Sequence, residues 1–193
     1  MISINFSPEI QKKIHEIVYE CDVETGVTLF GKKYGRVFQV LHVCGPGPIA
    51  THQVCHYSGD NDYASFVYEN LLKTDPELKH LGELHTHPFR MRRLSRGDRK
   101  TVKEVLTTYE EFIAGVMLRS NGGIEVYPIF FSREKPQGER MQVLYVAKPH
   151  RRRHFGSDGS GSAIAEEVFK CAYPRNRCKS ASQLSELGRA EAP

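Results

Sequence analysis

The sequence predicts an α/β protein of the α+β type, in which a mixed β-sheet is flanked by helices. Three observations lead to this prediction. Several short runs are rich in β-branched and aromatic residues and are bounded by glycine, proline or asparagine. Stretches with apolar residues at helical spacing stand before, between and after these runs. The composition, 39% hydrophobic and 26% charged, is that of a globular chain with a sizeable core. Such an order of elements favours helices packed on a sheet.

A helix and a hairpin are expected first. Ser7 can cap the helix, Pro8 suits its first position, and the helix is expected to end near Cys21. Its apolar residues share one face: Ile10, Ile14, Ile17 and Val18. Two strand-like runs follow at residues 27–34 and 36–43, and together they predict a hairpin.

A loop, a strand and a second helix come next. The GPGP segment at residues 45–48 fits neither a helix nor a central strand and therefore predicts a loop. Residues 52–57 indicate a third strand. Asp60 can cap a helix that stops near Asp75, which precedes a proline.

Strands dominate the expected second half of the domain. A short strand over residues 81–87 leads into a helix over 95–109. The runs 112–118 and 124–131 are joined through an Asn-Gly-Gly turn and predict a second hairpin. Residues 141–147 are the last expected strand.

Composition changes after these strands. We expect one domain over residues 1–148 and a polar, flexible C-terminal tail over residues 149–193, with a candidate short helix at 163–172. No apolar run is long enough to cross a membrane, and the N-terminus lacks the pattern of a signal peptide. A cytoplasmic location and no membrane partner are therefore expected.

Cysteine content and charge narrow the function classes. Five cysteines at scattered positions indicate free thiols rather than a disulfide framework. The net charge of +4 is mild, but basic residues gather at 90–100 and at 151–153. Such clusters attract acidic partners or phosphates. Because no nucleic-acid-binding module accompanies them, we do not expect a nucleic-acid partner.

Three residues suggest a metal site. His85 and His87 are two apart on one expected strand, so their imidazoles project from the same face and can converge on one ion. Asp98 opens the following helix and can supply a third ligand. Three protein ligands leave a position for water, as in hydrolytic zinc enzymes. The sequence therefore predicts a hydrolytic metal site with His85, His87 and Asp98 as candidate ligands of the kind that zinc takes.

Each part has a simpler interpretation. Ser95 and Asp98 have the spacing of an ordinary helix-capping arrangement. His85 and His87 could be partly buried hydrogen-bonding residues. The joint spacing, His-x-His-Pro followed after six residues by Ser-x-x-Asp, is much less common than its parts.

This joint spacing resembles a known family. Glu24, then HTHP at residues 85–88, six residues, and SRGD at 95–98 are similar to the JAMM motif of the JAB/MPN zinc metalloproteases. The GPGP segment and the Gly-Glu-Leu that precedes His85 also resemble prokaryotic JAB-domain proteins, which include deubiquitinase-like isopeptidases. The resemblance spans roughly residues 8 to 147. It implies an MPN fold, a single zinc ion, and hydrolysis of a peptide or isopeptide bond.

The resemblance also implies residue roles. Glu24 would act as general base and then general acid, and Ser95 would donate a hydrogen bond to the oxyanion. Glu83 is also acidic and closer in sequence to the histidines, so it could support the ligands or replace Glu24 as the base.

Substrates are implied only as a class. Family members cleave after the C-terminus of a ubiquitin-like protein, for tail maturation or deconjugation, and in bacteria some serve antiphage systems beside E1-like and E2-like proteins. The alternatives are a sulfur-carrier protein as substrate, or a non-catalytic MPN-type scaffold. The basic loop that contains Arg90 and Arg92 is expected to recruit an acidic patch of the substrate.

Overall fold

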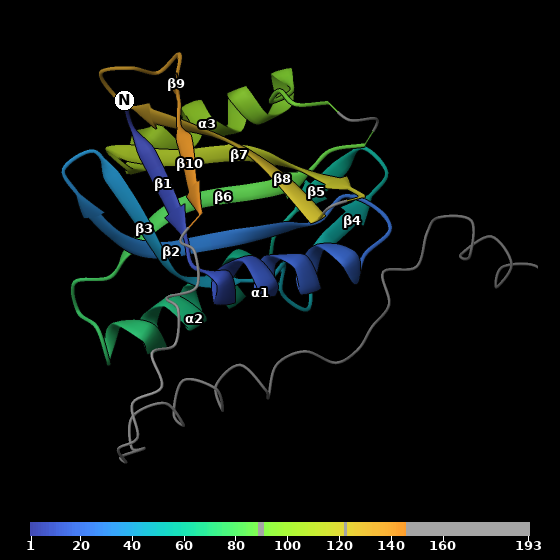
Figure 1. Cartoon of the computed structure of the whole chain (residues 1–193), viewed down its shortest axis with the longest axis horizontal. Coiled ribbons are helices and arrows are strands. Elements are labelled where there is room, and N and C mark those ends of the chain that lie inside the picture. Colours follow the sequence, from blue (N-terminus) through green and yellow to red (C-terminus); the bar gives the residue numbers. More distant parts are fainter. Residues whose placement is uncertain (89–90, 122, 146–193) are drawn as a thin grey trace, which may run out of the picture.

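One curved sheet of eight strands dominates the computed structural model, which describes residues 1–88, 91–121 and 123–145 (Figure 1). The strand order is β10-β1-β3-β2-β6-β7-β8-β9. The strands are β1 (Ser3–Phe6), β2 (Gly26–Tyr34), β3 (Val37–Cys44), β6 (Lys79–Thr86), β7 (Glu111–Ser120), β8 (Gly123–Ser132), β9 (Glu139–Arg140) and β10 (Gln142–Tyr145). A separate two-stranded sheet is formed by β4 (Thr51–Gln53) and β5 (His56–Ser58). The helices are α1 (Pro8–Tyr19), α2 (Asn61–Leu72) and α3 (Arg96–Thr108).

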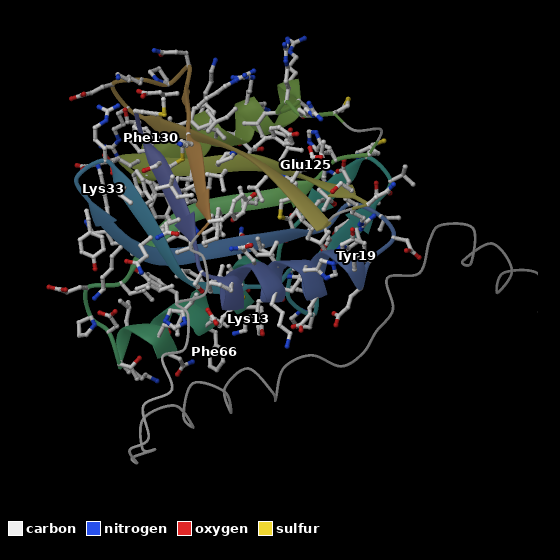
Figure 2. The ribbon with its side chains drawn as sticks, viewed as in Figure 1. Lys13, Tyr19, Lys33, Phe66, Glu125 and Phe130 are labelled. Atoms are coloured by element: carbon white, nitrogen blue, oxygen red, sulfur yellow. The ribbon has the colours of Figure 1, made fainter. Side chains whose placement is uncertain are left out.

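The sheet nearly closes on itself through one residue, Met141. This residue links β9, which pairs with β8, to β10, which pairs with β1 at the opposite end of the strand order. Its backbone N–H donates to the Pro128 carbonyl at 3.1 Å. Side chains from strands that are not neighbours also meet, since the rings of Phe38 on β3 and Phe130 on β8 are 5.4 Å apart. Lys33 of β2 lies next to these two rings, with its Nζ 5.7 Å from the centre of the Phe130 ring (Figure 2).

The predicted fold class, an MPN/JAB-like mixed sheet flanked by helices, is wrong. Strands make up 43% and helices 26% of the described residues, and the sheet is nearly closed and barrel-like. The physical reason is that periodicity reports local structure, whereas closure depends on strand pairing. The four-residue β1 and the two-residue β9 are too short to show a pattern, yet β1 joins β10 to β3 and β9 is the last strand at the other end of the sheet.

Most single elements agree with their local signals. Ser7, Asp60 and Ser95 are the N-caps of the three helices, as predicted. Both predicted hairpins are confirmed as β2–β3 and β7–β8. The expected third strand at 52–57 is instead the two short strands β4 and β5, which form a hairpin of their own.

Three apolar clusters connect the helices to the sheet. The largest joins α1 to β1, β2 and β3 and includes Ile4, Val18 and Leu29. A second packs α3 on β7 and β8 through Val102 and Leu106. The third packs α2 through Val67 and Leu71 against Phe30, Cys44 and Leu78. Helix α3 is therefore fixed against the strands that follow it, which determines where its first turn points.

Several sequence predictions lie outside the described residues. They include the tail at 149–193 with its candidate helix, the arginines at 151–153, Cys171 and Cys178, and the end of the last strand beyond Tyr145. The domain boundary at residue 148 accordingly stays a prediction. Within the described ranges, no helix has the length and apolarity needed to cross a bilayer.

His80 on β6 makes stability depend on pH. It packs among the rings of Phe30, Tyr109 and Phe112, and its Nδ1 has no hydrogen-bond partner among the described residues. This burial lowers the pKa of His80 from its ordinary value of 6.5 to about 4. The unfolded chain therefore binds a proton that the folded chain rejects. As the pH is lowered from 6.5 to about 4, the free energy of unfolding is therefore expected to decrease by about 3 kcal/mol in all.

Denaturant unfolding at a series of pH values measures this loss. His80→Phe keeps an aromatic side chain but cannot titrate, so its free energy of unfolding should fall less between pH 6.5 and 4. Equal pH dependence in the two proteins would contradict the assignment to His80.

Candidate metal centre

The end of β2 meets the end of β6 at the predicted site. Gly26 of β2 is paired with His85 of β6 in antiparallel register. The pairing continues past the strands, because the Thr86 N–H donates to the Thr25 carbonyl at 2.7 Å and the Thr25 N–H donates to the Thr86 hydroxyl at 2.9 Å. One step further, Glu24, which precedes Thr25, lies opposite His87, which follows Thr86. Opposed residues of an antiparallel pair share a face, so Glu24 lies on the face of the two histidines.

The three predicted ligands converge. The Nε2 atoms of His85 and His87 are 2.8 Å apart. His85 Nε2 is 3.5 Å from Asp98 Oδ1, and His87 Nε2 is 3.3 Å from Asp98 Oδ2. One ligand atom from each residue lies within 4.8 Å of the others, which is close enough for all three to hold one metal ion. The His87 side chain is 3% exposed, against 16% for His85 and 24% for Asp98. The site thus has a closed inner side at His87 and an open outer side.

These separations are close to those around a tetrahedral ion. Zinc bonds of about 2.0–2.1 Å at tetrahedral angles place neighbouring ligand atoms about 3.3–3.4 Å apart. The two contacts with Asp98, at 3.3 and 3.5 Å, are near that spacing but reach different carboxylate oxygens, and the contact between the histidine nitrogens, at 2.8 Å, is shorter. The donor set of two imidazoles and one carboxylate suits zinc.

Asp98 is held by the start of α3. Its Oδ2 accepts from the Ser95 N–H at 2.6 Å, and its own N–H donates to the Ser95 hydroxyl at 3.1 Å. This reciprocal pair is a capping box, so the simpler interpretation of these two residues is confirmed. It does not compete with metal binding, because the same carboxylate also faces both histidines. The box orients Asp98, and the Ser95 hydroxyl proton remains able to donate.

The predicted ligands shift one another's pKa values. Burial raises the pKa of Asp98, but hydrogen bonds from His85 and His87 and their charge outweigh it, so the net shift is strongly downward. Burial lowers the pKa of His87, while the hydrogen bond and charge of Asp98 and the charge of Glu24 raise it, and the net shift is upward. Asp98 is therefore anionic at neutral pH, as a metal ligand must be.

Glu24 is buried beside these ligands, with 8% of its surface exposed. Burial raises the pKa of its carboxyl, and the charges of His87 and then His85 oppose that rise. Glu83 is half-buried, and burial also raises the pKa of its carboxyl, but His85 is the one metal ligand whose charge opposes that rise. Glu24 interacts with all three ligands and Glu83 with one, which favours Glu24 as the proton carrier.

A small hairpin that the sequence did not reveal supports Glu24. The Gln53 carbonyl of β4 accepts from the Glu24 N–H at 3.1 Å. His52 Nδ1 lies 3.0 Å from the Glu24 carbonyl oxygen, which can only accept, so the imidazole donates there. Gly26 leaves the space that the Tyr57 ring of β5 occupies, because a Cβ at that position would overlap the ring. Both backbone groups of Glu24 are therefore held.

Arg119 is a second contribution that sequence reasoning missed. Its guanidinium donates to the carbonyls of Val18 at 2.9 Å, Asp22 at 3.3 Å, Val23 at 3.3 Å, and also Cys21. These carbonyls belong to the end of α1 and to the turn that leads directly into Glu24. Because Arg119 lies on β7, nearly a hundred residues away, no local pattern links it to the turn.

The basic loop between the ligands has a partner within the domain. Arg92 lies 3.5 Å from a Glu125 carboxylate oxygen and its guanidinium is 5.2 Å from the centre of the Tyr127 ring. Arg90, the other arginine expected to recruit substrate, lies outside the described residues. The charge of Arg92 is thus partly balanced by Glu125.

Comparison with known proteins adds a fold but no family. No known protein family and no curated protein matches the chain. The solution structure of protein DSY2949 from Desulfitobacterium hafniense is similar, with a TM-score of 0.59 and 13% sequence identity, over 79% of this chain and 99% of that chain. At that identity the likeness concerns the fold alone.

Proposed function

We propose that the chain is a zinc-dependent protease of the JAMM type that hydrolyses the peptide or isopeptide bond after the C-terminus of a ubiquitin-like protein, in the cytoplasm. The observation that carries this proposal is the convergence of His85, His87 and Asp98 with the buried carboxyl of Glu24 beside them. The site, and not the fold, supports this function, because one fold serves many chemistries.

His85, His87 and Asp98 would hold the zinc ion. When bound, zinc polarises a carbonyl and acidifies a water molecule, which makes amide hydrolysis feasible at neutral pH. The ligand set leaves a fourth position open, as catalytic zinc sites require. The open side at Asp98 and His85 gives a substrate access.

Glu24 and Ser95 would supply the rest of the chemistry. The Glu24 carboxylate accepts the proton of the attacking water and transfers it to the leaving amine nitrogen. A buried carboxyl with a raised pKa suits this double role better than a solvated one. The Ser95 hydroxyl accepts from the Asp98 N–H and keeps its own proton for the developing oxyanion.

Cleavage assays test this function. The purified chain is incubated with fusions in which a ubiquitin-like protein ending in Gly-Gly carries an added tail, and with an equivalent sulfur-carrier fusion. Cleavage after Gly-Gly that a chelator abolishes and zinc restores is the expected result. Cleavage that survives complete zinc removal would refute the metalloprotease. Zinc binding without cleavage of any fusion would favour the scaffold alternative.

Arg119→Gln is expected to lower kcat about tenfold to a hundredfold with little change in KM or zinc content. The reason is that Arg119 contacts the turn before Glu24 and no metal ligand, and a displacement of about 1 Å in a catalytic group costs rate on this scale. Steady-state kinetics and elemental analysis of the same preparation measure both quantities.

Arg133→Gln is the matched control. Arg133 donates to the Leu106, Thr107 and Thr108 carbonyls at the end of α3, which is the same kind of cap at a place remote from Glu24. Both variants should lose stability, about 1–3 kcal/mol each, but only Arg119→Gln should lose kcat. An equal loss of kcat in both would mean that Arg119 acts through general stability.

A further inference from the structure

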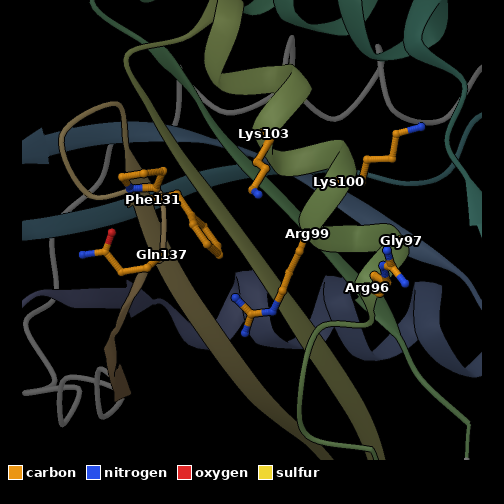
Figure 3. A pocket seen from close by; sticks show the side chains of 8 residues that line it. Arg96, Gly97, Arg99, Lys100, Lys103, Phe131 and Gln137 are labelled. Atoms are coloured by element: carbon orange, nitrogen blue, oxygen red, sulfur yellow. The ribbon is translucent and has the colours of Figure 1, made fainter.

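A basic groove runs along the outer flank of α3. It is a cavity of about 770 Å³ with one wall from the helix and the other from β8 and the turn before β9 (Figure 3). The helix wall carries the basic side chains Arg96, Arg99, Lys100 and Lys103, and the facing wall carries Phe131, Pro136 and Gln137. We call this cavity the α3 groove.

The positive charge of the α3 groove is largely unbalanced. Lys100 is 3.7 Å from Glu104, but both side chains are mostly exposed, so this pair is weak. No carboxylate of the described residues lies within ion-pair distance of Arg96, Arg99 or Lys103. Arg92, in contrast, is already paired with Glu125. Unpaired cations along one wall raise the potential in the cavity and favour an anionic occupant.

The facing wall has a different chemistry. Phe131, Pro136 and Gln137 are uncharged, and the Phe131 ring is itself buried. An occupant that fits both walls therefore presents carboxylates to α3 and uncharged groups to the facing wall. An extended peptide does this when acidic and uncharged residues alternate, because its side chains point to opposite sides.

The groove and the candidate metal centre share one helix. Asp98 faces the histidines from the first turn of α3, and Arg96 and Arg99 line the groove from the same turn. Lys103 is five residues after Asp98, about 7.5 Å further along the helix axis. Because successive helix residues are about 100° apart, Asp98 points to a different side of α3 from the groove residues, so a chain lying in the groove would leave the centre free.

We propose that the α3 groove docks an acidic segment of the substrate protein, which rests on the proposed function. Arginine favours this occupant because its planar fork pairs with a carboxylate through two hydrogen bonds. The chain's own tail is disfavoured by its net charge, since residues 146–193 contain nine lysines and arginines against five aspartates and glutamates. Single-stranded nucleic acid is the less suitable polyanion, because it needs exposed aromatic rings for stacking and the only ring that lines the described groove is buried.

Fluorescence anisotropy with a labelled peptide of alternating glutamate and leucine tests the proposal. The full chain carries Glu24→Gln throughout, so that no probe is cleaved. The double variant Arg99→Glu with Lys103→Glu is expected to weaken binding at least about tenfold at low salt, and added salt should weaken binding to the parent protein. Lys12→Glu with Lys73→Glu makes the same change in net charge on α1 and α2 and should bind within about twofold of the parent.

The outcomes separate this proposal from the proposed function. Binding that is lost in the groove variant but kept in the control supports the groove, even if no fusion is ever cleaved. Equal loss in both double variants, equal binding of a glutamine-for-glutamate peptide, or tighter binding of an oligothymidylate than of the acidic peptide would overturn it. Cleavage of fusions without any groove dependence would leave the protease intact and refute the docking role.

Discussion

Glu24→Gln is expected to lower kcat by about 10²–10⁴-fold while the protein keeps its metal. Glutamine preserves the size and shape of the side chain but cannot accept a proton from water. The backbone of Glu24 is held by Gln53 and His52, so the substitution should not move the turn. Kinetics with a cleavable fusion and elemental analysis on the same sample separate lost chemistry from lost metal.

Glu83→Gln is the control for this experiment. Glu83 is half-buried and also has a raised pKa, but it interacts with His85 and with neither other ligand. Its variant should retain most of the turnover. Full activity in Glu24→Gln together with loss in Glu83→Gln would transfer the role of general base to Glu83.

Asp98→Asn is expected to weaken metal binding at least about a hundredfold, because it replaces the anionic ligand with a neutral amide. Asparagine can still accept from the Ser95 N–H, so the capping box and the start of α3 should persist. Metal content measures the first effect. Thermal unfolding measures a second effect, the loss of the stability that bound metal gives to the folded state. A ligand at a hundred times its Kd contributes about 2.7 kcal/mol of such stability.

Ser95→Ala separates the cap from the ligand. It removes the hydroxyl that accepts from the Asp98 N–H and should cost about 0.5–2 kcal/mol of stability with metal binding retained. In Asp98→Asn, by contrast, chelator should no longer change the unfolding temperature. If Asp98→Asn binds metal as tightly as the parent protein, the carboxylate is a helix cap and not a ligand.

Local chemistry made the secondary structure predictable. Serine or aspartate caps followed by apolar residues at helical spacing predicted all three helices, and β-branched runs around turn residues predicted both hairpins. These signals work because caps, turns and amphipathic faces depend on neighbouring residues. The wrong fold class has the same origin, since nothing local tells that β9 and β10 bring the two ends of the sheet together through Met141.

In the candidate site, too, some features could be predicted from the sequence and others could not. The spacing of His85, His87 and Asp98 was sufficient to propose a metal site, because two ligands lie two residues apart at the end of one strand and the third opens the next helix. The support for Glu24 could not be predicted: it comes from the register of β2 on β6, from the β4–β5 hairpin, and from Arg119 on β7. Those contacts join segments far apart in the chain, and only the folded sheet brings them together.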